Sequence, residues 1–211
     1  MNLKTEYLEF LKDNFSGLKI KMPLFYNWNL GLRFDLQKEF TNPVDTDDED
    51  YFSEVYHRAK KLFEFCFEQN DTVYLSVFSY KWRKQRIKKS NFIFKLLKSG
   101  SKTENVFDKV ANRYEPNEKW NRLLIKEKIN NIDIDNLIIG LCNTDFPTMR
   151  PCIREEVYLM NIDKKLVFHI YDDRGLDILA TNKNLLNEIY DRFDKWILEY
   201  DREKIKQQLN K

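Results

Sequence analysis

The 211-residue chain is predicted to be an α+β protein, in which helices pack on an antiparallel sheet that includes a C-terminal three-stranded meander. Two patterns predict this class. Segments 156–162, 166–171 and 176–180 are rich in β-branched and aromatic residues and are joined by short polar turns, which is typical of a meander. Helices and strands elsewhere do not alternate regularly, so the pattern does not favour a parallel α/β fold.

The N-terminal half combines helical and strand periods. Apolar residues at helical spacing predict a helix over 3–15 and a longer one over 51–66. The longer helix follows an acidic block at 45–50, where the helix dipole favours negative charge. Strict alternation over 26–36 predicts a strand with one apolar face, and 73–82 is a second β-rich run.

The middle of the chain is less regular. Residues 98–118 are polar and poorly periodic, so loops are expected there, with one helical turn at 107–110. A strand is expected over 120–129. Either Asp133 or Asp135 can cap the short helix that follows, because aspartate accepts a hydrogen bond from the first free amides of a helix.

The chain is expected to end in a long C-terminal helix that Thr181 caps. Its apolar stripe consists of Leu186, Ile189, Phe193, Ile197 and Tyr200, which recur at helical spacing. The stripe predicts that this helix packs against the sheet.

Composition predicts a single domain over 1–211 with an aromatic-rich core, because 42% of the residues are hydrophobic. The N-terminus lacks the apolar core of a signal peptide, and no apolar run is long enough to span a membrane. We therefore expect a cytoplasmic protein. The three cysteines, Cys66, Cys142 and Cys152, form no C-x-x-C pair and are expected to be reduced.

The most informative stretch is Asp172-Asp173-Arg174-Gly175, called the acidic corner below. Asp at the first position and Gly at the fourth suit a type I turn followed by a left-handed residue, because glycine adopts positive φ without a Cβ clash. If Gly175 forms the bulge of this hairpin, four cross-strand pairs follow. They are Asp172–Leu176, Tyr171–Asp177, Ile170–Ile178 and Phe168–Ala180.

This register separates apolar from polar side chains, whereas a slip by one residue would mix them on both faces. It places His169, Tyr171 and Asp177 on one face, with His169 diagonal to Asp177 and close enough for an electrostatic contact. The candidate binding residues are Asp172, Asp173, Arg174, Asp177, His169 and Tyr171.

The acidic corner also carries a family resemblance. A Tyr-Asp-Asp-Arg-Gly signature at 171–175, between an apolar-His strand and an apolar-Asp strand, resembles an uncharacterised bacterial domain family that is defined by this motif. Segments 23–28, 143–147, 156–162 and 194–202 are similar to the same family. The family is catalogued as a domain of unknown function, so the resemblance implies a bacterial origin but no activity, cofactor or catalytic residue.

A metal-assisted hydrolase is the first alternative function. Asp172, Asp173 and Asp177 can hold a divalent cation, because hard cations prefer clustered carboxylates, and His169 can act as acid or base. However, aspartate is common in ordinary turns, and Arg174 would partly neutralise the carboxylates. We therefore expect no metal site, no cofactor and no catalytic residue, and we favour a protein that is not an enzyme.

The second alternative is nucleic-acid binding through the basic run 81–89, which contains Trp82 and follows Tyr80. The acidic block at 45–50 and the net charge of +2 weigh against it. Two opposite charged patches suit a complementary protein partner instead. The leading hypothesis is therefore a protein-binding module, such as an immunity or antitoxin protein that neutralises a partner toxin.

Overall fold

The computed structural model describes residues 2–37, 49–79, 92–98, 103–111 and 119–211. Within them, seven strands form one antiparallel sheet in the order β1-β7-β6-β5-β2-β4-β3. The strands are β1 (Gly31–Asp35), β2 (Thr72–Ser79), β3 (Glu104–Ala111), β4 (Lys119–Lys128), β5 (Glu156–Asn161), β6 (Leu166–Asp172) and β7 (Gly175–Ala180). The α+β class and the meander β5-β6-β7 are confirmed.

Helices lie on both sides of this sheet. They are α1 (Leu3–Asn14), η1 (Leu24–Asn27), α2 (Glu49–Cys66), α3 (Phe92–Lys95), η2 (Ile129–Asn131), α4 (Ile134–Cys142), α5 (Lys183–Phe193), η3 (Asp194–Trp196), η4 (Glu199–Asp201) and α6 (Arg202–Leu209). None of the helices in the described part of the chain has the length and apolar character that a membrane crossing needs.

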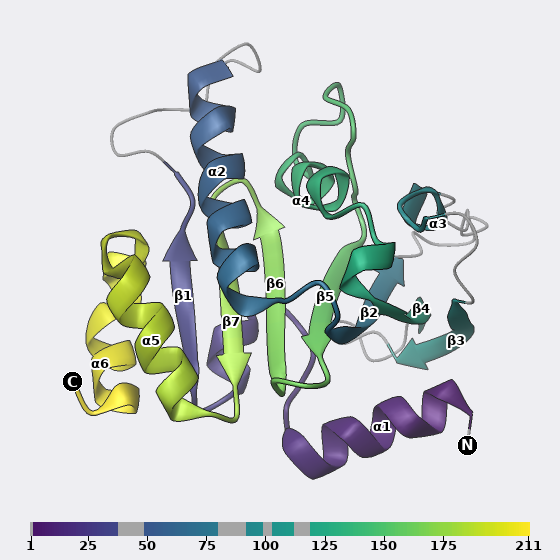
Figure 1. The fold of residues 1–211 in the computed structure, drawn as a ribbon, viewed down its shortest axis with the longest axis horizontal. Helices are drawn as coiled ribbons and strands as arrows, with labels where there is room; N and C mark the ends of the chain where they lie inside the picture. Colours follow the sequence, from purple (N-terminus) through teal and green to yellow (C-terminus); the bar gives the residue numbers. More distant parts are fainter. Residues whose placement is uncertain (1, 38–48, 80–91, 99–102, 112–118) are drawn as a thin grey trace.

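The two faces of the sheet carry different cores. The front face packs against α2, α4 and α5, of which α2 and α5 are drawn in front of the strands in Figure 1. The back face packs against α1 and the segment that leads into η1. Strand β2 shows how one strand contributes to both cores: Leu75 and Val77 point to the front core, whereas Tyr74 and Phe78 point to the back core. Because both sides are covered, central strands are buried almost continuously.

Two strand predictions differ from the structure. The strand expected over 26–36 is confirmed only for Gly31–Asp35, because residues 24–27 form the 3₁₀ helix η1. The loops expected over 98–118, with a helical turn at 107–110, are wrong where β3 forms. This strand pairs with β4 and lies at the edge of the sheet, so its sequence shows no strong apolar alternation. Its Asp108 instead accepts hydrogen bonds from Arg122 at 2.7 and 2.9 Å.

The C-terminal helix forms, but it is divided. Asn182 caps α5 in place of Thr181, since its side chain accepts hydrogen bonds from the amides of Asn184 and Leu185. Helix α5 ends at Phe193, and Ile197 forms a β-bridge with Phe34 of β1. The helical period continues through this break, so sequence alone did not reveal it.

Several other expectations can be placed on the structure. Helices over 3–15 and 51–66 are confirmed as α1 and α2, and the strand over 120–129 as β4. Of the acidic block, only Glu49 and Asp50 are described, and both are exposed in the first turn of α2. The basic run 81–89 lies outside the described residues. Cys66 and Cys142 are buried, Cys152 is half-buried, and none of the three forms a disulfide.

Asp133, and not Asp135, caps helix α4. Its carboxylate accepts a hydrogen bond from the backbone N–H of Asn136 at 3.2 Å and one from the side-chain amide at 2.7 Å. Asp135 instead forms an exposed ion pair with Lys60, with 2.7 Å between the charged atoms. The cap orients α4 against the front core, where Leu137, Ile138 and Leu141 are buried.

We expect Asp133→Ala to lower the free energy of unfolding by about 1 kcal/mol, because an amide of the first turn loses its acceptor. Urea denaturation of wild type and variant measures this difference. Asp135→Ala is the matched control and should cost about 0.5 kcal/mol or less, since exposed ion pairs contribute little. Equal losses in the two variants would contradict this assignment of the cap.

Candidate functional site

The acidic corner is a tight β6–β7 hairpin with an irregular register. Asp172 pairs with Gly175, so Asp173 and Arg174 form a two-residue loop, and Tyr171 is left unpaired before the pairing resumes at Ile170–Leu176. The bulge therefore lies at Tyr171 and not at Gly175. The expected pairs were wrong: the partners of Phe168 and Ile170 lie two residues from the expected ones, at Ile178 and Leu176, and the partner of Asp172 lies one residue away. Asp177 pairs with His169 in place of Tyr171. A shift of two keeps every side chain on its expected face.

Position 175 has room only for glycine. The expectation that it takes positive φ is wrong, because Gly17 is the glycine with that conformation among the described residues. A Cβ at Gly175 would lie 2.5 Å from the carbonyl oxygen of Phe34 and would also meet the hydroxyl of Tyr171. The close approach of β1 to the corner therefore requires a residue without a side chain.

Arg174 is held in place by its neighbour Asp172. The backbone N–H of Arg174 donates to Asp172 Oδ1 at 2.8 Å, and its Nε donates to Oδ2 at 2.9 Å, with a second guanidinium contact alongside. Asp172 is buried, whereas 62% of the Arg174 side chain is exposed. The corner therefore presents a guanidinium group whose orientation is largely fixed before any partner arrives.

Asp173 is buried by helix α2. It accepts a short hydrogen bond from the hydroxyl of Tyr51, and this hydroxyl accepts one from Gln37 Nε2 at 2.9 Å. Burial raises the pKa of the Asp173 carboxyl, and the Tyr51 hydrogen bond opposes that shift. Sequence reasoning missed Tyr51, which looks like an ordinary core position in the apolar stripe of α2.

Three carboxylates meet at this end of the sheet. Oxygens of Asp145, Asp172 and Asp173 all lie within 4.8 Å of one another. Asp145, which is exposed, comes from the loop after α4 and lies 3.7 Å from the guanidinium of Arg174. The arrangement can hold a hard cation only if Arg174 moves aside, because an arginine already neutralises the group.

Asp177 lies away from this cluster, on the back face. Its Oδ2 accepts a hydrogen bond from the backbone N–H of Phe25 at 2.9 Å, and its Oδ1 lies 3.3 Å from Arg33 Nε. Arg33 also pairs with Asp201 at 3.4 Å. Asp177 is fully buried and therefore joins β7 to η1 and β1.

Two tyrosines enclose the cation of this network. The guanidinium of Arg33 lies 5.3 Å from the ring centre of Tyr26 and 5.4 Å from that of Tyr171. The hydroxyl of Tyr26 donates to Asp201 at 2.7 Å. Tyr171, the bulged residue just before the corner, thus supports Arg33 with its ring. Sequence reasoning did not single out Arg33.

His169 lies directly opposite Asp177 in the pairing of β6 with β7. Its Nδ1 donates to the carbonyl oxygen of Val157 at 2.9 Å, because a carbonyl can only accept. Its ring stacks on Tyr158 with 4.1 Å between centroids. These contacts share no member with the Asp145–Asp172–Asp173 cluster.

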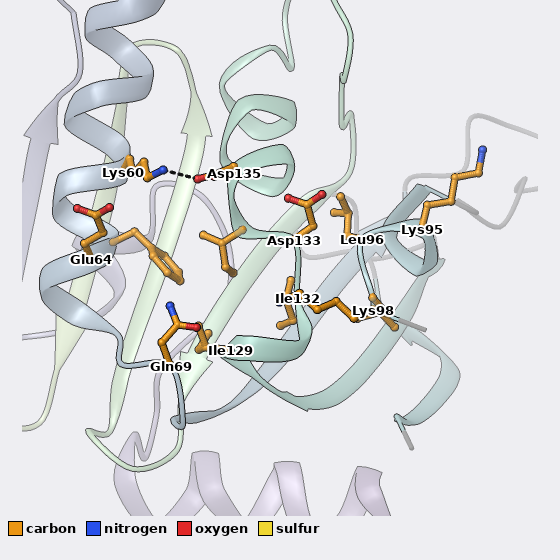
Figure 2. A pocket seen from close by; sticks show the side chains of 13 residues that line it. Lys60, Glu64, Gln69, Lys95, Leu96, Lys98, Ile129, Ile132, Asp133 and Asp135 are labelled. Atoms are coloured by element: carbon orange, nitrogen blue, oxygen red, sulfur yellow. Dashed lines mark ion pairs between the residues drawn. The ribbon is translucent and has the colours of Figure 1, made fainter. Parts of the chain in front are cut away.

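His169 and Tyr171 line a pocket of about 430 Å³ on the back face. A second pocket, of about 460 Å³, lies between α2, α4 and the segment around Leu96. Figure 2 shows this second pocket, where the ion pair between Lys60 and Asp135 closes one side. The Nζ of its Lys98 donates to the carbonyl of Asn130 at 2.6 Å, so much of its charged lining is already engaged.

The fold and the corner define an α+β protein built on an antiparallel sheet with a charged hairpin at its end. The chain belongs to the family described as "Domain of unknown function (DUF3885)", which it matches over residues 7–201. It is 25% identical over 210 residues to "Uncharacterized protein YnaE" of Bacillus subtilis (strain 168), an alignment that covers 90% of this chain and 96% of the relative. No solved structure matches it significantly.

The burial of Asp177 predicts a pH dependence of stability. Burial raises its pKa from the ordinary 3.8 to about 6, although the amide of Phe25 and the Arg33 cation act in the opposite direction. The unfolded chain has the lower pKa, so this group's stabilising contribution is fully present below about pH 3.8 and is lost as pH rises through about 6.

We expect the free energy of unfolding of wild type to fall between about pH 4 and about pH 7 by up to about 3 kcal/mol more than that of Asp177→Asn. Chemical denaturation of both proteins across this range measures the difference in slope. The asparagine variant loses contacts at every pH, so its absolute stability is not the test. Parallel curves would show that Asp177 has an ordinary pKa.

Proposed function

We propose that this protein acts by binding another protein, as an immunity or antitoxin protein binds a partner toxin, in the cytoplasm. The observation that carries the proposal is the exposed and preorganised guanidinium of Arg174. Two hydrogen bonds from its side chain and backbone fix it on the buried Asp172. Arginine is enriched at binding hot spots, and an arginine that is already ordered loses less entropy on binding.

The contact surface is centred on Arg174 and Asp145, whose side chains are 62% and 59% exposed. Asp173 supports the corner from inside through Tyr51, so it contributes by position and not by direct contact. The exposed acids Glu49 and Asp50 begin helix α2, whose Tyr51 reaches the corner. Mixed charge of this kind favours a partner with a complementary pattern.

A bacterial family with a homologue of similar length in Bacillus subtilis is a suitable context for such a role. We also infer that the Tyr-Asp-Asp-Arg-Gly segment defines the family, since Tyr171, Asp172 and Gly175 each have a specific structural task at the corner. Tyr171 supports Arg33, Asp172 orients Arg174, and Gly175 allows β1 to approach.

The test is affinity capture of the tagged protein from lysate of its source organism, with wild type and the variant Arg174→Glu side by side. Charge reversal at a hot-spot arginine should lower recovery of a stoichiometric partner by about tenfold or more. Arg192→Glu, an exposed arginine of α5, is the matched control and should retain the partner. Equal recovery by wild type and Arg174→Glu would remove the corner from the interface.

The metal-assisted hydrolase is the weaker candidate. The four residues first considered for it do not come together: Asp172 and Asp173 lie at the corner, whereas Asp177 pairs with Arg33 and His169 bonds to Val157. The observation in its favour is the close approach of Asp145 to Asp172 and Asp173.

We expect calorimetric titration with Mg²⁺ or Mn²⁺ to be flat, because Arg174 competes for the same carboxylate oxygens. Arg174→Ala provides the comparison, since removal of the cation makes the three carboxylates more attractive to a metal. Stoichiometric binding by wild type that Asp145→Asn abolishes would instead favour the hydrolase.

A further inference from the structure

The guanidinium of Arg33 is surrounded by two carboxylates and two tyrosine rings. Its Nε lies 3.3 Å from Asp177 Oδ1, and its Nη1 donates to Asp201 Oδ2 at 3.4 Å. The ring centres of Tyr26 and Tyr171 lie 5.3 and 5.4 Å from it. One cation is therefore shared by four groups, which come from β7, η4, η1 and β6.

The contact between Arg33 and Asp177 is incomplete. Arg33 Nε and Asp177 Oδ1 are both buried, and neither atom has a hydrogen-bond partner within the described part of the chain, although only 3.3 Å separates them. A buried charge without a hydrogen bond is poorly compensated for its loss of water. Burial accordingly raises the pKa of Asp177 to about 6. The carboxylate therefore takes up a proton in mildly acidic solution while the chain is folded.

Other titratable and charged groups surround Asp177. His169 lies directly opposite it in the pairing of β6 with β7, and Asp201 of η4 adds a second negative charge. Tyr171 of β6 keeps its proton in neutral solution, because burial raises its pKa to about 12. Lys204 of α6 lies 4.5 Å from the ring centre of the tyrosine in η1. Imidazole titrates in the same range as a raised carboxyl, so an experiment on Asp177 has to follow His169 separately.

Tyr171 connects this network to the acidic corner. It is the bulged residue of β6, so regular pairing with β7 does not hold it. Its ring lies against Arg33, and its hydroxyl occupies the space where a Cβ of Gly175 would lie. It also directly precedes Asp172, which orients Arg174. The position of one ring therefore depends on Arg33 and affects the turn that carries the exposed guanidinium.

We propose that Asp177 is a pH-sensitive switch for the acidic corner. When its carboxylate is protonated, Asp201 is the remaining negative charge of the network, and the guanidinium of Arg33 moves towards it. The ring of Tyr171 then loses its cation and shifts, so the turn that holds Arg174 becomes less ordered. The corner is therefore ordered in neutral solution and loosened in acid. This behaviour belongs to the folded chain alone and does not depend on a protein partner.

The test is NMR spectroscopy of the full chain with isotope-labelled tyrosine, aspartate, histidine and arginine, from about pH 8 to about pH 5. The ring signal of Tyr171 is assigned by its absence from the variant Tyr171→Phe. We expect the signals of Tyr171 and of the Asp177 carboxyl carbon to move with one shared midpoint near pH 6. The ring signal of His169 is followed in the same samples.

Asp177→Asn removes the titrating group and resembles the protonated carboxyl. In this variant we expect the Tyr171 signal to stay close to its acid position at every pH. Order at the corner is measured by the heteronuclear NOE of the Arg174 Nε–H group, which should fall in acid for wild type and stay low in Asp177→Asn. Arg122, whose Nε donates to Asp108 at 2.9 Å on the other side of the sheet, is the matched control and should keep a constant value.

Three results would overturn the proposal. The first is a Tyr171 signal that stays constant from about pH 8 to about pH 5. The second is a midpoint that Tyr171 shares with His169 and not with Asp177. The third is constant order at Arg174 while Tyr171 titrates, which would separate the network from the corner. All three are measured on wild-type protein, so the test does not depend on the folding of Asp177→Asn.

Discussion

The buried carboxylate of Asp177 is the contact on which the β1 side of the sheet depends. It receives the backbone N–H of Phe25 and the guanidinium of Arg33, and Arg33 in turn reaches Asp201 near the C-terminus. One charged group thus connects β7 to three segments that are far apart in sequence. Removal of one partner from a buried ion pair typically costs about 3–5 kcal/mol, because the other charge remains desolvated.

The contacts of Asp177 and Arg33 also account for the local shape of the chain at η1 and at Tyr171. The 3₁₀ helix η1 forms where an extended strand was expected, and its Phe25 amide points at Asp177. Tyr171 leaves the regular pairing of β6 and places its ring beside Arg33. The same bulge fixes the turn in which Asp172 orients Arg174. The candidate binding surface and the structural network are therefore linked through one residue.

Much of the fold could be predicted from local patterns. The meander, α1, α2 and the polar face with His169, Tyr171 and Asp177 followed from periodicity, which depends on the nearest neighbours of each residue. The register of the acidic corner could not be obtained in this way. The glycine pattern has two solutions, and the choice depends on the approach of β1, a strand about 140 residues earlier in the chain.

The candidate site was predicted only in part for the same reason. Asp172 and Arg174 are neighbours in sequence, so their contact could be expected. Tyr51, Asp145 and Arg33 come to the candidate residues from distant elements, and no local signal distinguishes them from ordinary core or surface residues. Sequence proximity also suggested one cluster of Asp172, Asp173 and Asp177, whereas strand geometry sends Asp177 to a different partner.

The order of strands has a consequence for how the protein is made. Strand β1 pairs with β7, and Gly31–Asp35 therefore meets residues 175–179. A ribosome adds about 5–20 residues per second, so β1 leaves it roughly 10 s before its partner exists. During that time β1 has no native strand to pair with, and its apolar side chains have no native core to pack against. The nascent chain therefore cannot complete this side of the sheet until residues 175–179 have been made.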